Sequence, residues 1–246
     1  MAWKGKPTLD ESLGRVTKFD NERKDAERVE GQVIPEPSSL ALGEAREFEL
    51  AIAHIDIDNF KGLSSSMKMK GLARFLSIYL TEMTYIVKEF GGDVESYSGD
   101  RVTALFGAGK GKAQAIEDCL NCGLTMLTVI QYVLNPYLAR ISLPSFRCAV
   151  GMEFGETWIE RVGIKGENQL TLVGYPVNVA SQLQELAKPS QILLAHGFYS
   201  GLSEGEKKHC QKMEPDKTWN WTYGEPRIPY PYYGYGGHWK DFPLEK

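Results

Sequence analysis

The sequence has no apolar run long enough to span a membrane and no excess of basic residues. The 246 residues include 28 Lys and Arg against 32 Asp and Glu, for a net charge of -4. Because no basic stripe is present, we expect no nucleic-acid partner. A membrane span needs about 20 apolar residues, whereas the best candidate, residues 124–134, is broken by Thr and Gln. Residues 1–7 also lack the apolar core of a signal peptide, so we expect a cytoplasmic protein.

Cysteine is scarce as well. Cys119 and Cys122 have the spacing of a metal-binding pair, but they fall within a helical pattern, and Cys148 and Cys210 are isolated. No paired histidines accompany them, as a zinc site would require. The pattern therefore predicts buried, reduced thiols.

The length and the 42% hydrophobic content predict one sizeable core with a small appendage. Residues 1–46 are expected to be an N-terminal extension, with a helix from Leu9 to about Val29 and a linker at Val33–Ser39. Residues 47–200 are expected to form the catalytic domain. The aromatic, proline and glycine residues beyond position 201 predict an irregular cover packed by its rings, with a partner-binding surface as the alternative.

Strand-like and helix-like patterns alternate in the central region. Helices are expected at 72–90, from Lys112 to about Tyr137 with Pro136 near its end, and from Gly174 to Lys188. Strands are expected at Glu49–Phe60, Val94–Tyr97, Val102–Phe106, Phe146–Phe154, Thr157–Ile164, Gln169–Val173 and Gln191–Ala195. The antiparallel hairpins favour an α+β fold over α/β.

Two carboxylates stand at strand ends. Asp56 follows an apolar run, where an ionised carboxylate is costly unless a cation or donor satisfies it. Asp100 follows Gly99 in the turn of a predicted hairpin. If that hairpin lies beside the first strand, the two carboxylates converge and suit Mg²⁺ or Mn²⁺. Turn and cap chemistry without a metal is the alternative, since Asp is common in turns. Asp58 is expected to cap the following helix, with support of the metal ligands from behind as the alternative.

Three ordered motifs resemble the class III nucleotidyl cyclases. They are Asp-Ile-x-x-Phe at 56–60, Gly-Asp-x-x-x-Ala-x-Phe at 99–106, and Gly-x-x-Val-Asn-x-Ala-Ser at 174–181. Together they cover roughly residues 47–195. The resemblance implies a ferredoxin-like βαββαβ catalytic core and a nucleoside triphosphate substrate.

The resemblance also implies roles for individual residues. Two divalent ions, Mn²⁺ or Mg²⁺, would be held by Asp56, Asp100 and the backbone carbonyl of Ile57. Backbone N–H groups from Asn59 and Phe60 onward would bind the phosphates. Asn178 would orient the ribose in the site of the opposite subunit, which implies a homodimer with composite sites.

The sequence departs from the family at a catalytic position. Where the family carries an arginine that stabilises charge on phosphorus, this chain has Gln182. An amide cannot make a charge-assisted contact of that kind. Either Arg101, Arg147 or Arg161 supplies the cation, or catalysis is weak, or the protein only binds nucleotide.

The two family base-reading positions hold Ser96 and Thr171. Neither is charged, and hydroxyls suit a uracil or cytosine edge because they can donate or accept. This looks like the bacterial pyrimidine cyclases of phage-defence (Pycsar) systems, which make cyclic UMP or cyclic CMP as a second messenger for a separate effector. The alternatives are an adenylate cyclase and a catalytically silent nucleotide-binding regulator. A polymerase-like palm would need a basic template channel, which the composition does not offer.

Overall fold

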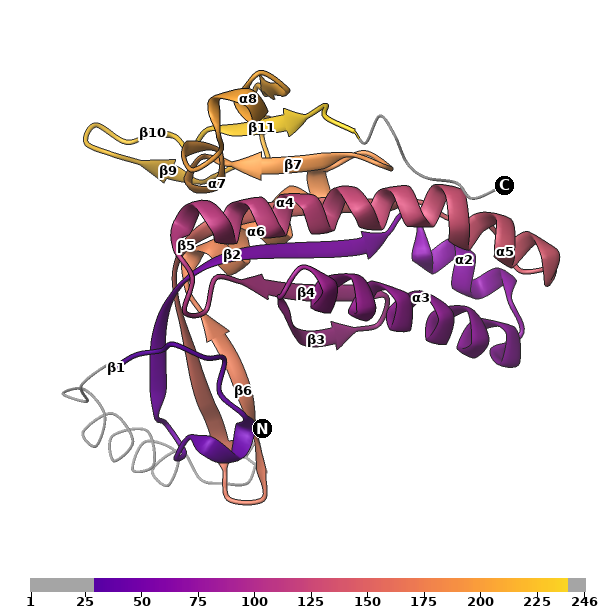
Figure 1. The fold of residues 1–246 in the computed structure, drawn as a ribbon, viewed down its shortest axis with the longest axis horizontal. Helices are drawn as coiled ribbons and strands as arrows, with labels where there is room; N and C mark the ends of the chain where they lie inside the picture. Colours follow the sequence, from indigo (N-terminus) through magenta and orange to yellow (C-terminus); the bar gives the residue numbers. More distant parts are fainter. Residues whose placement is uncertain (1–28, 239–246) are drawn as a thin grey trace, which may run out of the picture.

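The computed structural model describes residues 29–238 and has a mixed sheet at its centre (Figure 1). Its strands run in the order β3-β4-β2-β5-β7-β11-β8, with β1 paired to β2 and β6 to β5. The strands of this sheet are β1 (Val29–Glu30), β2 (Ala45–Ile57), β3 (Asp93–Ser98), β4 (Arg101–Phe106), β5 (Cys148–Ile164), β6 (Glu167–Val173), β7 (Ile192–Ala195), β8 (Cys210–Lys212) and β11 (Tyr232–Tyr235). The predicted α+β class is confirmed. The helix predicted from Leu9 lies outside the described residues, except at its last position.

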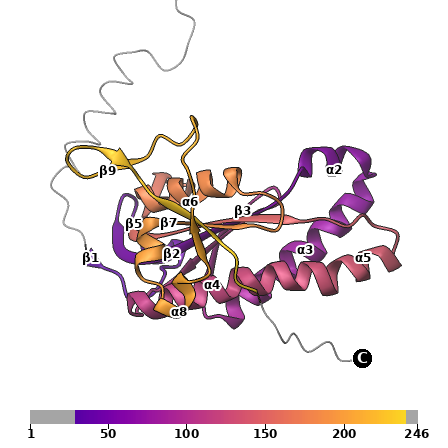
Figure 2. The same cartoon turned by 90° about the horizontal axis from the view of Figure 1, so that it is seen from above.

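The helices lie on both faces of the sheet (Figure 2). They are α2 (Phe60–Ser66), α3 (Met69–Glu89), α4 (Lys112–Val129), α5 (Asn135–Arg140), α6 (Tyr175–Leu186), α7 (His196–Ser200) and α8 (Glu204–Lys207), with a 3-10 turn η1 at Pro37–Ser39. Residues 51, 53, 55 and 57 of β2 pack in one core with α3 and α4, whereas 48, 50 and 52 pack in a second core that includes α6. Because strand side chains alternate, positions 54 and 56 face the α6 side.

The helix that begins at Lys112 is longer than predicted. It passes from α4 through a π-helical segment, η2 (Ile130–Leu134), into α5, which ends at Arg140. Pro136 was expected to lie at its end but stands in the first turn of α5. A proline clashes with the carbonyl four residues earlier in a regular helix, and the wider π turn before it accommodates the change.

The two strands predicted at Phe146–Phe154 and Thr157–Ile164 are one strand, β5. It pairs with β2 without interruption from Ala45 opposite Glu160 to Ile57 opposite Cys148. Gly155 does not break it, and the Tyr175 and Pro176 side chains lie close above this glycine. The C-terminal part of β5, from Trp158 onward, pairs with β6 in a hairpin that projects from the body of the molecule (Figure 1).

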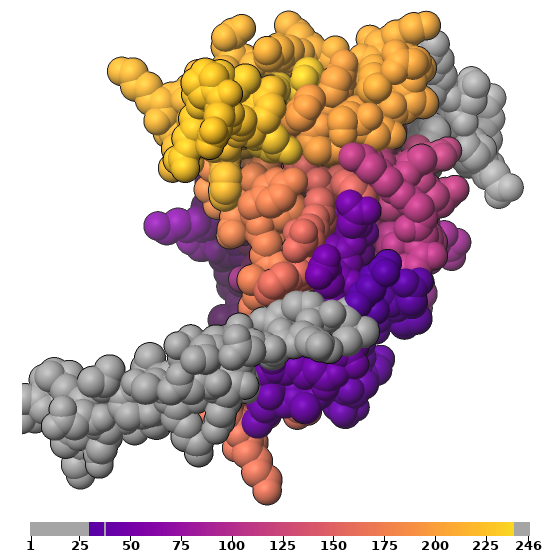
Figure 3. All heavy atoms as spheres, turned by 90° about the vertical axis from the view of Figure 1, so that its left-hand side faces the viewer, coloured from indigo at the N-terminus to yellow at the C-terminus, as the bar shows by residue number. Residues whose placement is uncertain are grey.

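The C-terminal residues gather at one end of the molecule (Figure 3) and are more regular than predicted. β11 pairs with β7 and with β8, so it extends the main sheet, and β9 (Thr222–Tyr223) pairs with β10 (Ile228–Pro229). Tyrosine favours strands, which explains why the tyrosine-rich run adopts one. The predicted ring packing is present: Tyr199 stacks on Tyr233 with ring centroids 3.8 Å apart.

The cysteines within residues 29–238 are free thiols. Cys119, Cys122 and Cys148 are buried as predicted, whereas Cys210 is half-buried. In the same range, no helix is both long and apolar enough to cross a membrane.

Glu153 is a buried carboxyl group of β5 that contacts Tyr230 of the C-terminal segment. The Tyr230 hydroxyl donates to its Oε1 at 3.3 Å, and within the described chain Oε2 has no hydrogen-bond partner. Burial raises the pKa of Glu153 from 4.5 to about 8. The folded protein therefore retains a proton that the unfolded chain releases, so the contribution of Glu153 to stability is full below pH 4.5 and is lost as the pH rises through 8.

The variant Glu153→Gln removes this ionisation. We expect it to be more stable than the parent by about 1–3 kcal/mol at pH 8, with a smaller difference at pH 5. Urea unfolding at both pH values measures this. An unchanged pH dependence of stability would contradict the assignment.

Candidate active site

The end of β2 and the β3–β4 turn bring Asp56 and Asp100 together. β4 pairs antiparallel with β2, with Val102 opposite Ile55, and Gly99 supplies the positive φ, +68°, at the turn. The backbone N–H of Ile57 donates to Asp56 Oδ1 at 3.1 Å and to Asp100 Oδ2 at 3.0 Å. One donor is thus shared by two carboxylates that are distant in sequence.

The two carboxylates repel each other. Burial, followed by hydrogen bonding and charge repulsion from Asp56, raises the pKa of Asp100 to about 7. A cation between the two carboxylates would stabilise their ionised forms and so lower the pKa of Asp100. No group of three or more His, Cys, Asp or Glu residues suited to a metal occurs within residues 29–238. Two carboxylates with a neighbouring backbone carbonyl nevertheless fit Mg²⁺ or Mn²⁺, which take further ligands from water and substrate phosphates.

Arg101 joins this carboxylate pair to helix α6. Its guanidinium lies 3.4 Å from Asp56 Oδ2 and donates to Ser181 Oγ at 3.0 Å and Gln184 Oε1 at 2.9 Å. Its Nε is buried and has no hydrogen-bond partner among the described residues. Arg101 therefore places a positive charge between the candidate metal ligands and α6.

His54, which the sequence analysis did not single out, makes a second link to α6. Its Nε2 lies 3.1 Å from the carbonyl oxygen of Val177, and its Nδ1 lies 3.1 Å from Thr103 Oγ1. Because a carbonyl can only accept, Nε2 carries the hydrogen and Nδ1 accepts from the hydroxyl. Burial lowers the pKa of His54 to about 4. The neutral ring therefore fixes the turn that carries Asn178.

Asn178 and Gln182 lie one turn apart on α6. Asn178 is exposed, and its Nδ2 donates to the Gly174 carbonyl at 3.5 Å. Gln182 is engaged by the C-terminal segment: its Nε2 donates to the Thr218 carbonyl, and Trp221 Nε1 donates to its Oε1, both at 2.6 Å. Gln182 therefore fastens α6 to the segment that covers it.

Ser96 and Thr171 line one cavity of about 860 Å³ between β3 and β6. His54, Arg101 and Val177 line it as well, so it reaches the carboxylate end of β2. Residues 34–36 of the predicted linker form another wall. The two positions expected to read the base are thus brought together within a single chain.

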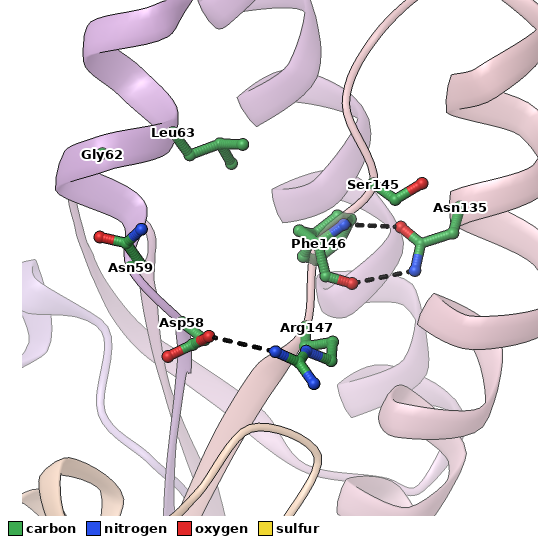
Figure 4. Close-up of a pocket in the computed structure, with 8 residues that line it drawn as sticks. All are labelled: Asp58, Asn59, Gly62, Leu63, Asn135, Ser145, Phe146 and Arg147. Atoms are coloured by element: carbon green, nitrogen blue, oxygen red, sulfur yellow. Dashed lines mark hydrogen bonds and ion pairs between the residues drawn. The ribbon is translucent and has the colours of Figure 1, made fainter.

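A second cavity, of about 610 Å³, lies beyond Asp58 (Figure 4). Asn59 and Gly62 at the start of α2 face Arg147 across it, and Arg147 lies 3.8 Å from Asp58. Asp58 was expected to cap the helix, but the N-cap residue is Asn59, which has a left-handed backbone and makes no side-chain cap bond. Phe60 is the first residue of α2 and packs against the main core.

Residues 44–218 match the model of the adenylate and guanylate cyclase catalytic domain. The chain belongs to this family. It is a class III nucleotidyl cyclase, and cyclases of this class use divalent metals.

The chain is 27% identical over 206 residues to a uridylate cyclase from Burkholderia cepacia, covering 77% of this chain and 88% of that protein. It is also 27% identical over 174 residues to an adenylate cyclase from Anabaena cylindrica, covering 67% of this chain but only 33% of that protein. Among solved structures, the adenylyl cyclase CyaB from P. aeruginosa superposes with a TM-score of 0.68 at 22% identity, covering 81% of this chain and all of that one. That structural likeness supports the cyclase fold.

The role of His54 as a link predicts a loss of stability in His54→Phe. The change removes both ring contacts and leaves the buried Thr103 hydroxyl without its acceptor, so we expect the free energy of unfolding to fall by about 1–3 kcal/mol. Thr103→Val, which removes only one contact, should lower it by less. Urea unfolding of the two variants tests this. Equal free energies of unfolding for His54→Phe and the parent would show that the contacts of His54 with Val177 and Thr103 do not stabilise the fold.

Proposed function

We propose that this cyclase converts a pyrimidine nucleoside triphosphate, UTP ahead of CTP, to the 3′,5′-cyclic nucleotide and pyrophosphate. The observation that carries the proposal is the cavity that Ser96 and Thr171 both line, since Arg101 in its wall lies 3.4 Å from Asp56 Oδ2 of the carboxylate pair. Neither base-reading position supplies the charge expected for a purine. The similarity to a uridylate cyclase supports the same choice.

Asp56, Asp100 and the Ile57 carbonyl would hold two Mn²⁺ or Mg²⁺ ions. When bound, such ions acidify the ribose 3′-hydroxyl and neutralise charge on the triphosphate. The chain's own contribution is to hold the two carboxylates in place through the Ile57 N–H. The backbone at Asn59 and Phe60 follows these ligands in the sequence, and Asn59 lines the cavity that contains Arg147. The phosphates would lie at this backbone.

Arg101, Arg147 and Arg161 are the candidates to supply the positive charge that Gln182 lacks, and Arg101 has the most suitable position. Arg161 donates to the Leu40 carbonyl and to Asn168, both at 2.7 Å, and so fastens the N-terminal segment to the hairpin. Arg147 is exposed beside Asp58. Arg101 already touches Asp56 and Ser181, so a phosphate held at the carboxylates would lie within its reach.

The active form would be a homodimer in which Asn178 orients the ribose at the partner's carboxylates. Asn178 is exposed, and the apolar side chains of Val173 and Tyr175 beside it are 43% and 46% exposed. Exposed apolar residues next to a polar functional residue are typical of an interface. The cyclic nucleotide would act as a second messenger for a separate antiviral effector.

A catalytically silent nucleotide-binding regulator is the second candidate. It is favoured by the contacts of Gln182 with Thr218 and Trp221, which leave the family arginine position without a charge. Turnover separates this candidate from the proposed enzyme.

Incubation with Mn²⁺ and each of the four ribonucleoside triphosphates, with products resolved by mass, tests the activity. We expect cyclic UMP as the main product, cyclic CMP as the lesser one, and none from Asp100→Ala. Asp118→Ala, which removes a carboxylate from α4 on the other face of the sheet, serves as the control and should retain activity. Cyclic AMP as the main product would instead indicate an adenylate cyclase, and no product would favour the silent regulator.

Mixing two inactive variants tests the composite site. Asn178→Ala should lower kcat by roughly 10²–10³, and Asp100→Ala should abolish it. In an equimolar mixture, half of the dimers are mixed and each has one intact site, so about one quarter of the parent activity should return. No recovery, with mixed dimers shown by native mass spectrometry, would place Asn178 in the same site as its own chain's Asp100.

A further inference from the structure

A β-bulge in strand β3 adds a side chain to the wall of the 860 Å³ cavity that Ser96 and Thr171 line. We call this cavity the base cavity. Val94 pairs with Ala104, but the next pair joins Ser96 to Thr103, so Glu95 is an extra residue on this strand. In a regular strand, neighbouring side chains point to opposite faces. A bulge instead re-aims a side chain next to a functional site. Glu95, Ser96 and Thr103 all line the cavity that contains Thr171.

Glu95 and Ser96 form a polar unit inside this cavity. The Ser96 hydroxyl donates a hydrogen bond to the Glu95 carboxylate. An ionised carboxylate can only accept, and it has room for further donors. The nearby Lys88 pairs with Asp93 at 2.5 Å. The β3 wall thus offers a strong acceptor, while the Thr171 hydroxyl on β6 can donate.

We propose that Glu95 determines the base preference by accepting a hydrogen bond from N3–H of uracil. The uracil edge presents a donor, N3–H, between two carbonyl acceptors. A carboxylate matches the central donor, and the Thr171 hydroxyl can donate to a flanking carbonyl, because the Ser96 hydroxyl already donates to Glu95. Cytosine presents a lone pair at N3, which a carboxylate repels. The inference rests on the proposed pyrimidine cyclase function and deepens it, because it assigns UTP over CTP to one side chain.

The decisive experiment compares UTP with N3-methyl-UTP in the parent protein and in Glu95→Ala. Methylation removes the donor, so kcat/KM of the parent should fall by about 10- to 100-fold. Glu95→Ala should lower kcat/KM for UTP by a similar factor. Methylation should then have at most a two- to three-fold further effect on this variant, because the acceptor is already absent.

Glu36→Ala is the matched control. Glu36 lines the same cavity but belongs to the segment before β2, and it is exposed, so this variant removes an equal charge from an element other than β3. We expect it to keep the full methylation penalty. Glu95→Gln, which keeps an uncharged acceptor oxygen and nearly the same shape, should show an intermediate loss and provides the readout if the alanine variant unfolds. A methylation penalty of the same size in the parent and in both Glu95 variants would overturn the proposal.

Calorimetry separates this inference from the proposed function. If the parent cyclises no triphosphate, the proposed activity is wrong. The affinities of the parent and of Glu95→Ala for UTP and for N3-methyl-UTP are then measured in the presence of Mn²⁺. A methylation penalty on binding that disappears in Glu95→Ala supports base reading by Glu95. Equal affinity of the parent for UTP and N3-methyl-UTP, or no binding of UTP by the parent, overturns base reading by Glu95.

Discussion

The site depends on one backbone N–H that serves two carboxylates. Ile57 is the last residue of a strand whose side chain is buried in the core, so its amide is held rigidly while Asp56 and Asp100 converge on it. Burial, together with the neighbouring Asp56, raises the pKa of Asp100 to about 7, and the Ile57 N–H offsets only part of this shift. The fold therefore concentrates negative charge at the point where we propose that divalent cations bind. The pairing of β2 with β4 and β5 is what maintains this concentration against repulsion.

Helix α6 is tied to the same strand end from two directions. His54 binds the carbonyl that precedes Asn178, and Arg101 bridges Asp56 to Ser181. Each contact joins a side chain of β2 or β4 to a group of α6, namely the Val177 carbonyl or the Ser181 hydroxyl. The position of the helix is thus coupled to the strands that carry the carboxylates, and with it the position of Asn178 relative to Asp56 and Asp100 of the same chain.

Much of the fold could be predicted because local patterns agreed with the tertiary structure. The amphipathic period of α3, the glycine in the turn before Asp100 and the three motifs were all visible in the sequence. What could not be predicted depends on long-range contacts. The strand β11 forms only because β7 and β8 offer pairing partners, and the π turn before Pro136 depends on packing. The bulge at Glu95 is a shift of pairing with Thr103, which composition does not encode. His54 is a lone histidine in an apolar run, and only the structure reveals its two partners.

The contacts of Gln182 bear on how such a site can change over time. The Thr218 carbonyl and the Trp221 indole each have their hydrogen bond with this amide. Arginine at this position could still donate to the carbonyl, but it has no acceptor for the indole N–H. The substitution Gln182→Arg would thus leave the Trp221 indole N–H in the covering segment without its acceptor. A charged side chain at position 182 is therefore compatible with this covering segment only if position 221 also changes, so the two positions are energetically coupled although they are distant in sequence.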